Sequence, residues 1–466
     1  MPALAVAASV PTPTHRWLTA LPALLVLLLP VVQLYMYLDG MQVYPFADEW
    51  RFVGITCVDG PCPLTRWVLE QHGDHRIPLQ KGFQSALLHA SEFDFRSLVV
   101  ANMALAAGAA ALLLSCARAL RGRASAWDVV IPLIIFNPMA GYALWGFHLQ
   151  FLSSVLSVCV FAWAVLRRTI RPLHAGIGVI AVASGAACGL NGLLLASMLL
   201  PLCWYALAPY RQRIVFQAST VLLVLTFAAL WLTWTPASGS STLPDMAAFT
   251  AFLSGLLGSS LLPPTDGHWK AWAVGGTVLL GLIANALTSN PTAPTRSGAV
   301  LTALTGSVLI TLAAVAMGRA EYQGGWQPTL AMHYGIIGML LPLLAWLACA
   351  RHGTRSATRL AGLIMICLFG TGLFQAAQWR TAYTDAQRVP KSNAYYAIKS
   401  DALPIEDAVH LHAGEYWIDD PTLVAEMVLR MPILRAAYQR KWPERPSGRS
   451  DVSTPDQSEA GESLRR

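Results

Sequence analysis

Long apolar runs separated by short polar segments dominate the pattern of this chain. A helix that spans a bilayer needs about 20 predominantly apolar residues. Eleven runs approach or reach that length, and they cover residues 17–37, 97–118, 127–144, 147–166, 173–188, 190–208, 213–234, 270–289, 298–317, 331–350 and 359–378. The pattern therefore predicts an all-α polytopic membrane protein with about 11 transmembrane helices. The apolar, Gly/Ser-rich segment 246–262 is too short to span and indicates a re-entrant or surface-lying helix.

Basic residues in the short connections give the expected orientation. With eleven spans, all of these connections fall on one side of the membrane, which the positive-inside rule makes cytoplasmic. The basic residues concerned are His15, Arg16, Arg118, Arg121, Arg123, Arg167, Arg168, Arg171, Arg211, Arg213, Arg296, Arg351, Arg355 and Arg359. Residues 39–95, 235–269, 318–330 and the C-terminal segment are then expected to face outside.

The chain divides into four parts on this pattern. Residues 1–16 form a cytoplasmic N-terminus, and residues 17–378 form a transmembrane domain whose long first outer loop, 39–95, contains amphipathic helices. Residues 379–442 form a small soluble helical region outside, where Pro421 is expected in the first turn of a helix that runs to Tyr438. Residues 443–466 have no apolar period and are expected to be disordered. The first run, 17–37, is read as an uncleaved span because no small-residue cleavage pattern follows it.

The amino-acid composition supports a membrane protein and limits the classes of binding partner to be expected. Only 12% of the residues are charged, whereas a soluble globular chain has about 25%. The net charge of +7 lies mostly in the short loops, where topology accounts for it, so nucleic-acid binding is excluded. The sequence has no Gly-rich phosphate loop, no G-x-S-x-G motif and no Cys-x-x-Cys pair.

Two cysteines, Cys57 and Cys62, lie in the polar first loop, and the other cysteines lie in or beside apolar runs. A short-range disulfide between them is compatible with an oxidising compartment. The sequence alone leaves both the bonded and the free state open.

The first outer loop carries the densest polar clusters of the chain. Asp48 and Glu49 are adjacent, and a carboxylate at the outer mouth of a helical bundle can act as a general base or hold a divalent metal. Because neighbouring side chains of a loop point apart, only one acid is expected to reach the reacting atoms. The alternative is a solvated carboxylate beside Trp50 at the membrane–water boundary. About twenty-five residues later come Asp74, His75 and Arg76, suited to proton transfer and phosphate binding, or to capping and salt bridges within the loop.

Two further polar groups lie at predicted outer ends of spans. Arg319 ends an apolar run, Tyr322 follows it, and His333 and Tyr334 begin the next span. These residues can bind a lipid phosphate. Alternatively, the Arg319 side chain can extend along the helix so that its charge reaches the membrane–water interface. His148 and Gln150 stand inside an apolar run and face either a cavity or a partner helix, where they would form helix–helix hydrogen bonds.

The order of these elements resembles the GT-C superfamily of integral-membrane glycosyltransferases. Within it, the chain is similar to bacterial members related to the dolichyl-phosphate-mannose and arabinose transferases. The matching elements are an Asp-Glu-Trp motif at 48–50, His75-Arg76 preceded by Asp74 where the family has Glu, a Trp-Gly-Phe segment at 145–147, Gly318-Arg319, and His333-Tyr334 where the family has Arg-Tyr. The resemblance covers residues 15–380, and its motifs are short.

The resemblance implies transfer of a sugar from a polyprenyl-phosphate donor to a glycan, lipid or protein acceptor on the outer face. Asp48 would be the general base, or the ligand of a divalent metal if one is used, with Glu49, Asp74 and His75 shaping the site. Arg76, Lys270 and Arg319 would hold the donor phosphate, and His148, Gln150, Tyr322, His333 and Tyr334 would complete the substrate site. Membrane lipids are the other expected contacts. The implied location is a bacterial inner membrane, with the N-terminus cytoplasmic and the C-terminus periplasmic.

Two other functions fit parts of the pattern. A transporter or flippase of lipid-linked glycans would share the lipid-phosphate groove but would need no catalytic base. A non-catalytic membrane scaffold would only present the C-terminal segment. The clustering of polar residues at the outer ends of spans favours the transferase, because a flippase would be expected to use charged residues within spans.

Overall fold

The structure is a computed structural model of the full chain. It describes residues 13–36, 41, 43–57, 60–72, 76–137, 145–167, 169–235, 244–259, 275–276, 281, 295–320, 328–352, 359, 361–367, 370, 373, 395, 397–399, 403–415 and 421–441.

The described part is helical apart from two short strands, so the predicted all-α class is confirmed. In chain order its elements are α1 Pro13–Met36, η2 Ala47–Phe52, β1 Thr56–Cys57, β2 Gly60–Pro61, α2 Leu64–Leu69, α3 Pro78–Ala90, α4 Arg96–Arg121, η3 Ala126–Val129, α5 Val130–Ile135, η5 Gly146–His148, α6 Leu149–Val165, α7 Pro172–Ala186, α8 Leu190–Ala206, η6 Ala208–Tyr210, α9 Ile214–Leu232, α10 Met246–Ser259, α12 Arg296–Arg319, α13 Pro328–Gly338, α14 Leu340–His352, α16 Ile405–Glu415 and α17 Pro421–Lys441.

Six helical segments in the described ranges are long and apolar enough to cross a membrane, which makes this a multi-pass membrane protein. They are Leu18–Met36, Arg96–Arg121, Gly146–Val165, Ile214–Leu232, Arg296–Arg319 and His333–Arg351. The predicted spans 127–144, 173–188 and 190–208 correspond to shorter apolar helices. The predicted spans 270–289 and 359–378 lie largely outside the described residues. The count of eleven therefore stays a prediction.

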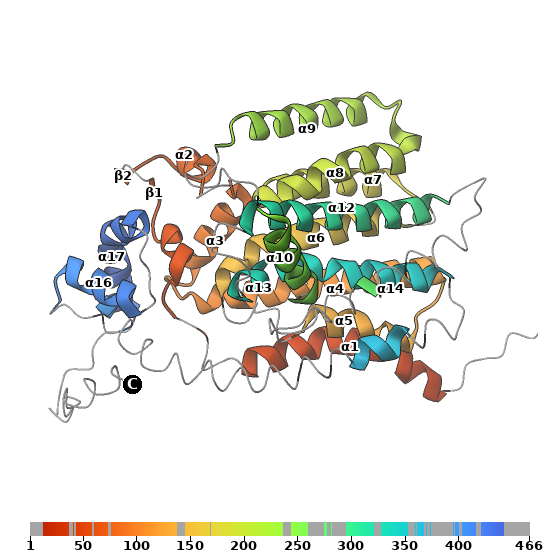
Figure 1. The fold of residues 1–466 in the computed structure, drawn as a ribbon, viewed down its shortest axis with the longest axis horizontal. Coiled ribbons are helices and arrows are strands. Elements are labelled where there is room, and N and C mark those ends of the chain that lie inside the picture. The colour runs from red at the N-terminus through yellow and green to blue at the C-terminus, as the bar shows by residue number, and fades with distance from the viewer. Residues whose placement is uncertain are drawn as a thin grey trace, which may run out of the picture.

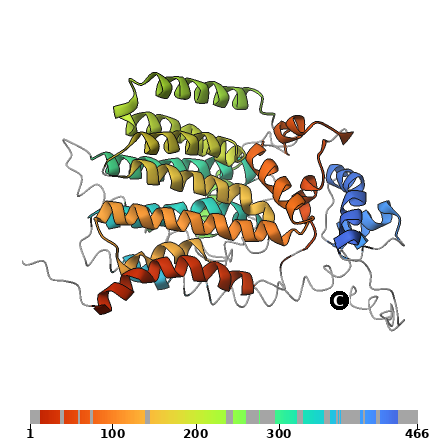
Figure 2. The same ribbon diagram turned by 180° about the vertical axis from the view of Figure 1, so that it is seen from behind.

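The long helices lie side by side as one bundle, with α1 and α9 at opposite edges (Figures 1 and 2). Both edge helices expose apolar side chains, such as Leu27 of α1 at 71% and Leu232 of α9 at 86%. In the centre, α6 and α14 are almost entirely buried. An apolar outer surface around a buried centre is the arrangement expected of helices that face lipid.

Helix α10 lies where the sequence suggests a short re-entrant or surface helix. It packs against α12 and α13, and its Phe252 and Leu256 are fully buried. One side of α10 therefore packs into the bundle, whereas its first residue, Met246, is 74% exposed.

The first loop folds into compact pieces at one end of the bundle (Figure 1). Strands β1 and β2 pair antiparallel, and a disulfide joins Cys57 to Cys62 across them. Helix α3 has its polar side inward: Gln80, Lys81 and Gln84 are buried, whereas Leu79 and Phe83 are 42% and 46% exposed. This inverted face indicates that α3 covers a polar interior while it offers apolar side chains to a lipid environment.

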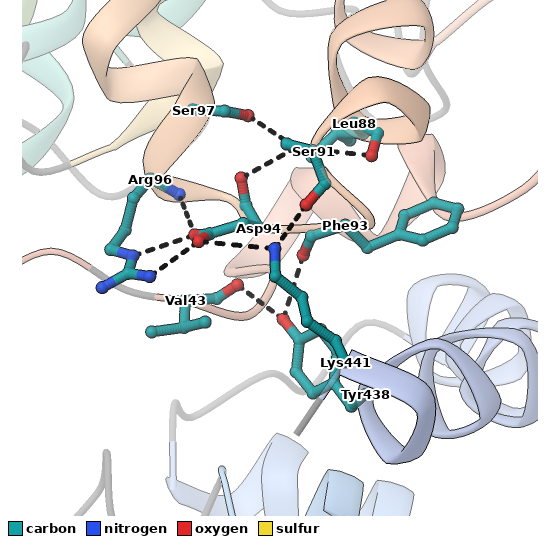
Figure 3. Close-up of polar contacts among 9 residues, drawn as sticks. All are labelled: Val43, Leu88, Ser91, Phe93, Asp94, Arg96, Ser97, Tyr438 and Lys441. Atoms are coloured by element: carbon teal, nitrogen blue, oxygen red, sulfur yellow. Dashed lines mark hydrogen bonds and ion pairs between the residues drawn. The ribbon is translucent and has the colours of Figure 1, made fainter. Parts of the chain in front are cut away.

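The C-terminal helices α16 and α17 dock on the same end of the bundle (Figures 1 and 3). The Tyr438 hydroxyl lies 2.5 Å from the carbonyl oxygen of Val43 and 3.2 Å from that of Phe93. Lys441 Nζ donates to the carbonyl oxygen of Ser91 at 2.5 Å and lies 3.7 Å from Asp94. Helix α17 therefore ties the beginning of the first loop to its end. This helix is the one that the sequence predicts after Pro421.

Candidate functional site

The site predicted in the first loop lies on η2, the short helix that carries Asp48 and Glu49. Helix η2 contacts α3, η5 and α17, so three segments far apart in sequence meet around it. The two neighbouring acids point in different directions. Glu49 is buried at 2% exposure, whereas the Asp48 side chain is 38% exposed.

Glu49 holds η2 against η5 through its carboxyl group. Its Oε2 accepts a hydrogen bond from Phe46 N at 2.9 Å, and its Oε1 accepts one from Phe147 N at 3.2 Å. Burial raises the pKa of Glu49 to about 8, although bonds from the backbone N–H groups of Phe46, Gly146 and Phe147 favour the charged form. At neutral pH the group is mostly protonated and enclosed. Glu49 is therefore a positioning residue.

The close contact between η2 and η5 requires a glycine at position 146. A Cβ atom on Gly146 would lie 2.5 Å from Leu98 Cβ and 2.7 Å from Glu49 Oε1. Two buried side chains of α3 also form hydrogen bonds to η5. Gln84 Nε2 donates to the carbonyl oxygen of Gly146 at 2.9 Å, and Gln80 Nε2 donates to that of Phe147 at 3.3 Å.

Asp48 faces the outer side of this junction and pairs with His72. The distance from Asp48 Oδ1 to His72 Nε2 is 3.6 Å. His72 is buried and packs in a cluster with Phe52 and Phe147, whose ring centroids lie 6.0 and 5.4 Å from its own and 6.4 Å from each other. A half-exposed carboxylate beside a fixed imidazole can accept a proton from a bound hydroxyl group.

A row of aromatic rings leads from His72 towards α13. Trp145 stacks on Phe147 at 5.0 Å and lies 4.7 Å from the His333 ring. His148 Nε2 and His333 Nδ1 are 2.8 Å apart, so the two facing nitrogens share one proton. The helix–helix hydrogen bond considered for His148 is thus present, and it joins the start of α6 to α13.

Ring contacts connect the segment that carries Asp48 to α13. Phe46, two residues before Asp48, lies 5.6 Å from Trp145, and Trp145 lies 4.7 Å from His333 between ring centroids. Tyr334, the next residue of α13, lines a cavity together with Arg319. The convergence of Asp48 and Arg319 on one substrate stays a prediction.

A cavity of about 280 Å³, lined in part by Arg319, opens between α8, α9, α12 and α13. Its lining is mostly apolar and includes Trp231 and Trp234, with Arg319 and Tyr334 as the candidate phosphate ligands. Gln150 of α6 does not line this cavity; it is buried, and its Oε1 has no hydrogen-bond partner among the described residues. A cation in the wall of an apolar cavity suits an amphiphile with a phosphate head.

Arg76 has protein partners in the structure. Its Nε donates to the carbonyl oxygen of Leu69 at 3.1 Å, and its two Nη atoms donate to the hydroxyl and carbonyl oxygens of Thr233 at 3.0 and 2.9 Å. These contacts fasten the first loop to the end of α9. Its predicted role on the donor phosphate remains a prediction, as do the roles of four residues outside the described ranges, namely Asp74, His75, Lys270 and Tyr322.

Behind η2 lies a buried group of charges that sequence reasoning missed. Glu426 of α17 lies 3.2 Å from Arg51 and 2.8 Å from Arg430. Lys81 Nζ donates to the carbonyl oxygens of Trp67 and Glu70 at 2.7 and 2.9 Å, and burial lowers its pKa to about 8. The sequence feature that could have revealed this group is the set of polar residues on α3. Polar side chains at helical spacing on one side of an otherwise apolar helix can face a polar interior.

Helix α16 adds a second support to η2. Trp50, which is fully buried, donates from Nε1 to His412 Nε2 at 3.1 Å. Tyr44 packs edge-on against the same histidine at 5.8 Å. The C-terminal helices therefore back the segment that presents Asp48. His72 and His412 were not predicted, because neither has a local sequence signal that separates it from the other histidines.

A divalent metal would find an incomplete ligand set here. Asp48 and His72 can supply two donors, and no group of three or more His, Cys, Asp or Glu residues with suitable geometry occurs in the described ranges. Protein-held cations normally use more ligands than two.

Comparisons with protein-family models, curated proteins and solved structures found no match to this chain. Its function is therefore inferred from the chemistry and geometry of the site.

Proposed function

We propose that this protein transfers a sugar from a polyprenyl-phosphate donor to a hydroxyl acceptor at the end of the bundle that carries the first loop. The observation that carries the proposal is the series of contacts between the Asp48 segment and an apolar cavity: Phe46 lies 5.6 Å from Trp145 and Trp145 lies 4.7 Å from His333, and the neighbouring Tyr334 lines the cavity together with Arg319. This combination supplies a proton acceptor, a cation for phosphate and a place for a prenyl chain.

The reaction assigns each group one task. The acceptor hydroxyl oxygen attacks the anomeric carbon of the donor sugar, and its proton passes to Asp48. The bond between the anomeric carbon and the phosphate oxygen breaks, and both electrons leave with polyprenyl phosphate. Arg319 stabilises the charge that develops on the phosphate. A single displacement of this kind inverts the configuration of the sugar.

The supporting residues keep the carboxylate in place. His72 lies beside Asp48 at 3.6 Å, and Glu49 fixes η2 to η5. The His148–His333 pair joins the start of α6 to α13, whose Tyr334 lines the cavity with Arg319. These contacts give the reacting groups a fixed geometry, which is a large part of enzymatic rate enhancement.

The orientation of the chain agrees with chemistry on the outer side. Basic residues gather at the opposite end of the bundle, which the positive-inside rule makes cytoplasmic. The Cys57–Cys62 disulfide lies at the Asp48 end and suits an oxidising compartment such as a bacterial periplasm. We therefore infer an inner-membrane enzyme with an outward-facing site.

The decisive experiment compares donor binding with transfer in purified full-length protein. Undecaprenyl phosphate serves as the binding probe, and a panel of radiolabelled polyprenyl-phosphate sugars with crude glycolipid acceptors serves for turnover. Asp48→Asn should retain undecaprenyl phosphate binding but lose transfer by about 10²–10⁴-fold. Arg319→Gln should weaken probe binding itself. Arg118→Gln, an exposed charge on α4, is the matched control and should change neither.

Undiminished transfer by Asp48→Asn would refute the assignment of the base. A flippase instead predicts that wild type and Asp48→Asn move a fluorescent lipid-linked glycan across vesicles equally fast, without a new glycosidic bond. A scaffold predicts no specific binding of the probe.

A further inference from the structure

A second polar cavity lies at the end of the bundle opposite Asp48, where helices α4, α6 and α14 end and α12 begins. Its volume is about 310 Å³. The lining residues are Ala119, Leu120, Leu166, Arg167, Arg296, Ser297 and Arg351. Three arginines from three separate segments thus converge on one small cavity. Positive-inside topology explains which side they occupy but not why they meet.

Neutral groups are among the contacts that hold these arginines at the cavity. Arg167 lies 4.4 Å over the Trp163 ring and donates to Ser115 Oγ at 3.2 Å, and its buried Nε has no partner among the described residues. Arg296 donates to the carbonyl oxygen of Arg167, and Arg351 donates to the hydroxyl group of Thr295. These bonds bring like charges together, which is unfavourable unless an anion balances them.

The chain has almost no acid that can provide this balance. Asp and Glu are absent from residues 129–244, 267–320 and 322–384, which include every arginine of the cavity. The acid closest to this end in sequence, Asp128, is already engaged: it accepts from Arg121 at 2.7 Å and from Trp346 at 3.2 Å. An anion from outside the chain can provide this balance.

The lining of the cavity identifies the kind of anion. Guanidinium groups bind phosphate oxygens with paired N–H donors. Ala119, Leu120 and Leu166 add apolar surface beside the arginines, at the ends of helices that face lipid. A basic pocket between membrane helices is a known type of site for anionic lipid head groups.

We propose that this three-arginine cavity binds the phosphate of an anionic phospholipid. The site is separate from the one that carries Asp48 and does not depend on sugar transfer. Its occupant would lock the ends of α4, α6, α12 and α14 together.

The test uses purified full-length protein with defined lipids. Phosphatidylglycerol in phosphatidylcholine mixed micelles should raise the thermal unfolding midpoint and should remain bound in native mass spectrometry. The double variant Arg296→Gln/Arg351→Gln should lower the affinity for phosphatidylglycerol by about tenfold or more. The matched control Arg118→Gln removes a charge from the same end of α4 but does not line the cavity, so its affinity should match wild type.

Three results would overturn the proposal. One is equal phosphatidylglycerol affinity in wild type and the double variant, and another is an equal loss in Arg118→Gln. The third is full stabilisation by millimolar inorganic phosphate alone, which would assign the site to free phosphate. If the double variant does not fold, Arg296→Lys keeps the charge but loses the paired donors, and it should still weaken lipid binding measurably.

Discussion

The two ends of the helical bundle handle charge in opposite ways. At the first-loop end, acids and bases are paired within the chain: Asp48 with His72, and Glu426 with both Arg51 and Arg430. At the other end, arginines line a cavity and the surrounding sequence is free of acids from residue 129 to residue 244. One end is electrostatically self-contained, and the other can be balanced by an external anion.

The difference shows what each end is built to do. A self-contained network holds its members in fixed positions, which suits a site that must present Asp48 precisely. An arginine cavity with no acid in its lining suits a mobile anionic lipid. Asp128 is the exception, because it is an acid at the arginine-rich end and bonds to Arg121, Trp346 and Ser125.

Replacing Asp128 should give the largest effect on stability. Asp128→Ala leaves the nearly buried Arg121 and the buried Trp346 N–H without their acceptor, and no neighbouring acid in the sequence can substitute. The expected loss is about 3–5 kcal/mol in the free energy of unfolding. Thermal unfolding of the purified protein in detergent measures it. The exposed Glu406→Ala serves as control and should change stability by no more than about 0.5 kcal/mol. A loss as small as that of the control would mean that the two ends do not differ as described.

The stability of the first-loop end should depend on pH because Glu49 and Lys81 titrate differently in the folded and unfolded chain. Burial raises the pKa of Glu49 from 4.5 to about 8 and lowers that of Lys81 from 10.5 to about 8. Between about pH 4.5 and 8, the folded chain keeps a proton on Glu49 that the unfolded chain has released, so stability falls as pH rises. Between about pH 8 and 10.5, the folded chain has lost the Lys81 proton that the unfolded chain keeps, so stability rises.

Unfolding midpoints across this range should therefore pass through a minimum near pH 8. The falling limb has a slope of up to about 1.4 kcal/mol per pH unit from Glu49. Glu49→Gln should remove that limb and leave the rising one. A falling limb of unchanged slope in Glu49→Gln would show that another group is responsible.

Gly146→Ala tests how tightly the first-loop end is packed. The added Cβ would meet Leu98 and Glu49, so the expected loss of stability is about 1–3 kcal/mol, with reduced sugar transfer because η2 shifts. Gly306→Ala in α12 is a matched control, since its Cβ meets nothing within 4 Å. This control should be neutral or stabilising by about 0.5–1 kcal/mol. Equal behaviour of the two variants would argue against a rigid junction.

Tyr438→Phe should have the smallest effect. It removes the hydroxyl that bonds to Val43 and Phe93, and a hydrogen bond of this kind contributes about 1 kcal/mol. The expected result is faster proteolysis within α17, with little change in the midpoint of the transmembrane bundle. Tyr35→Phe, whose ring is 80% exposed, should leave the proteolysis rate unchanged. An unaltered rate in Tyr438→Phe would mean that α17 is held by its apolar contacts alone.

Much of the fold could be read from the sequence because its signals are long and local. The spans 17–37, 97–118 and 298–317 correspond to helices in the structure, since some twenty apolar residues in succession have few other solutions in a membrane protein. The lengths of short helices were harder to predict from the sequence. Residues 127–144 were predicted to form a full span, but the described helix there is Ala126–Ile135. The signal for α17 was likewise local, a proline at the first turn.

Only part of the candidate site could be predicted from the sequence. The neighbouring acids Asp48 and Glu49 suggested chemistry and divergent directions, and the structure assigns Glu49 to the interior. His72 and Lys81 were missed because their importance comes from what packs around them. Arg76 attracted attention as a phosphate ligand, whereas its structural contacts to Thr233 depend on where α9 ends.

The sequence by itself determined that this is a multi-pass helical membrane protein and which polar clusters stand out against its apolar background. Those features follow from local hydrophobicity, which acts within one helix at a time. The tertiary structure decided which of the two acids is buried, that Trp145 connects Phe46 of the first loop to His333, and that three arginines meet at the opposite end. Those outcomes depend on contacts between segments up to hundreds of residues apart, and electrostatics and burial are set by the neighbours that packing provides.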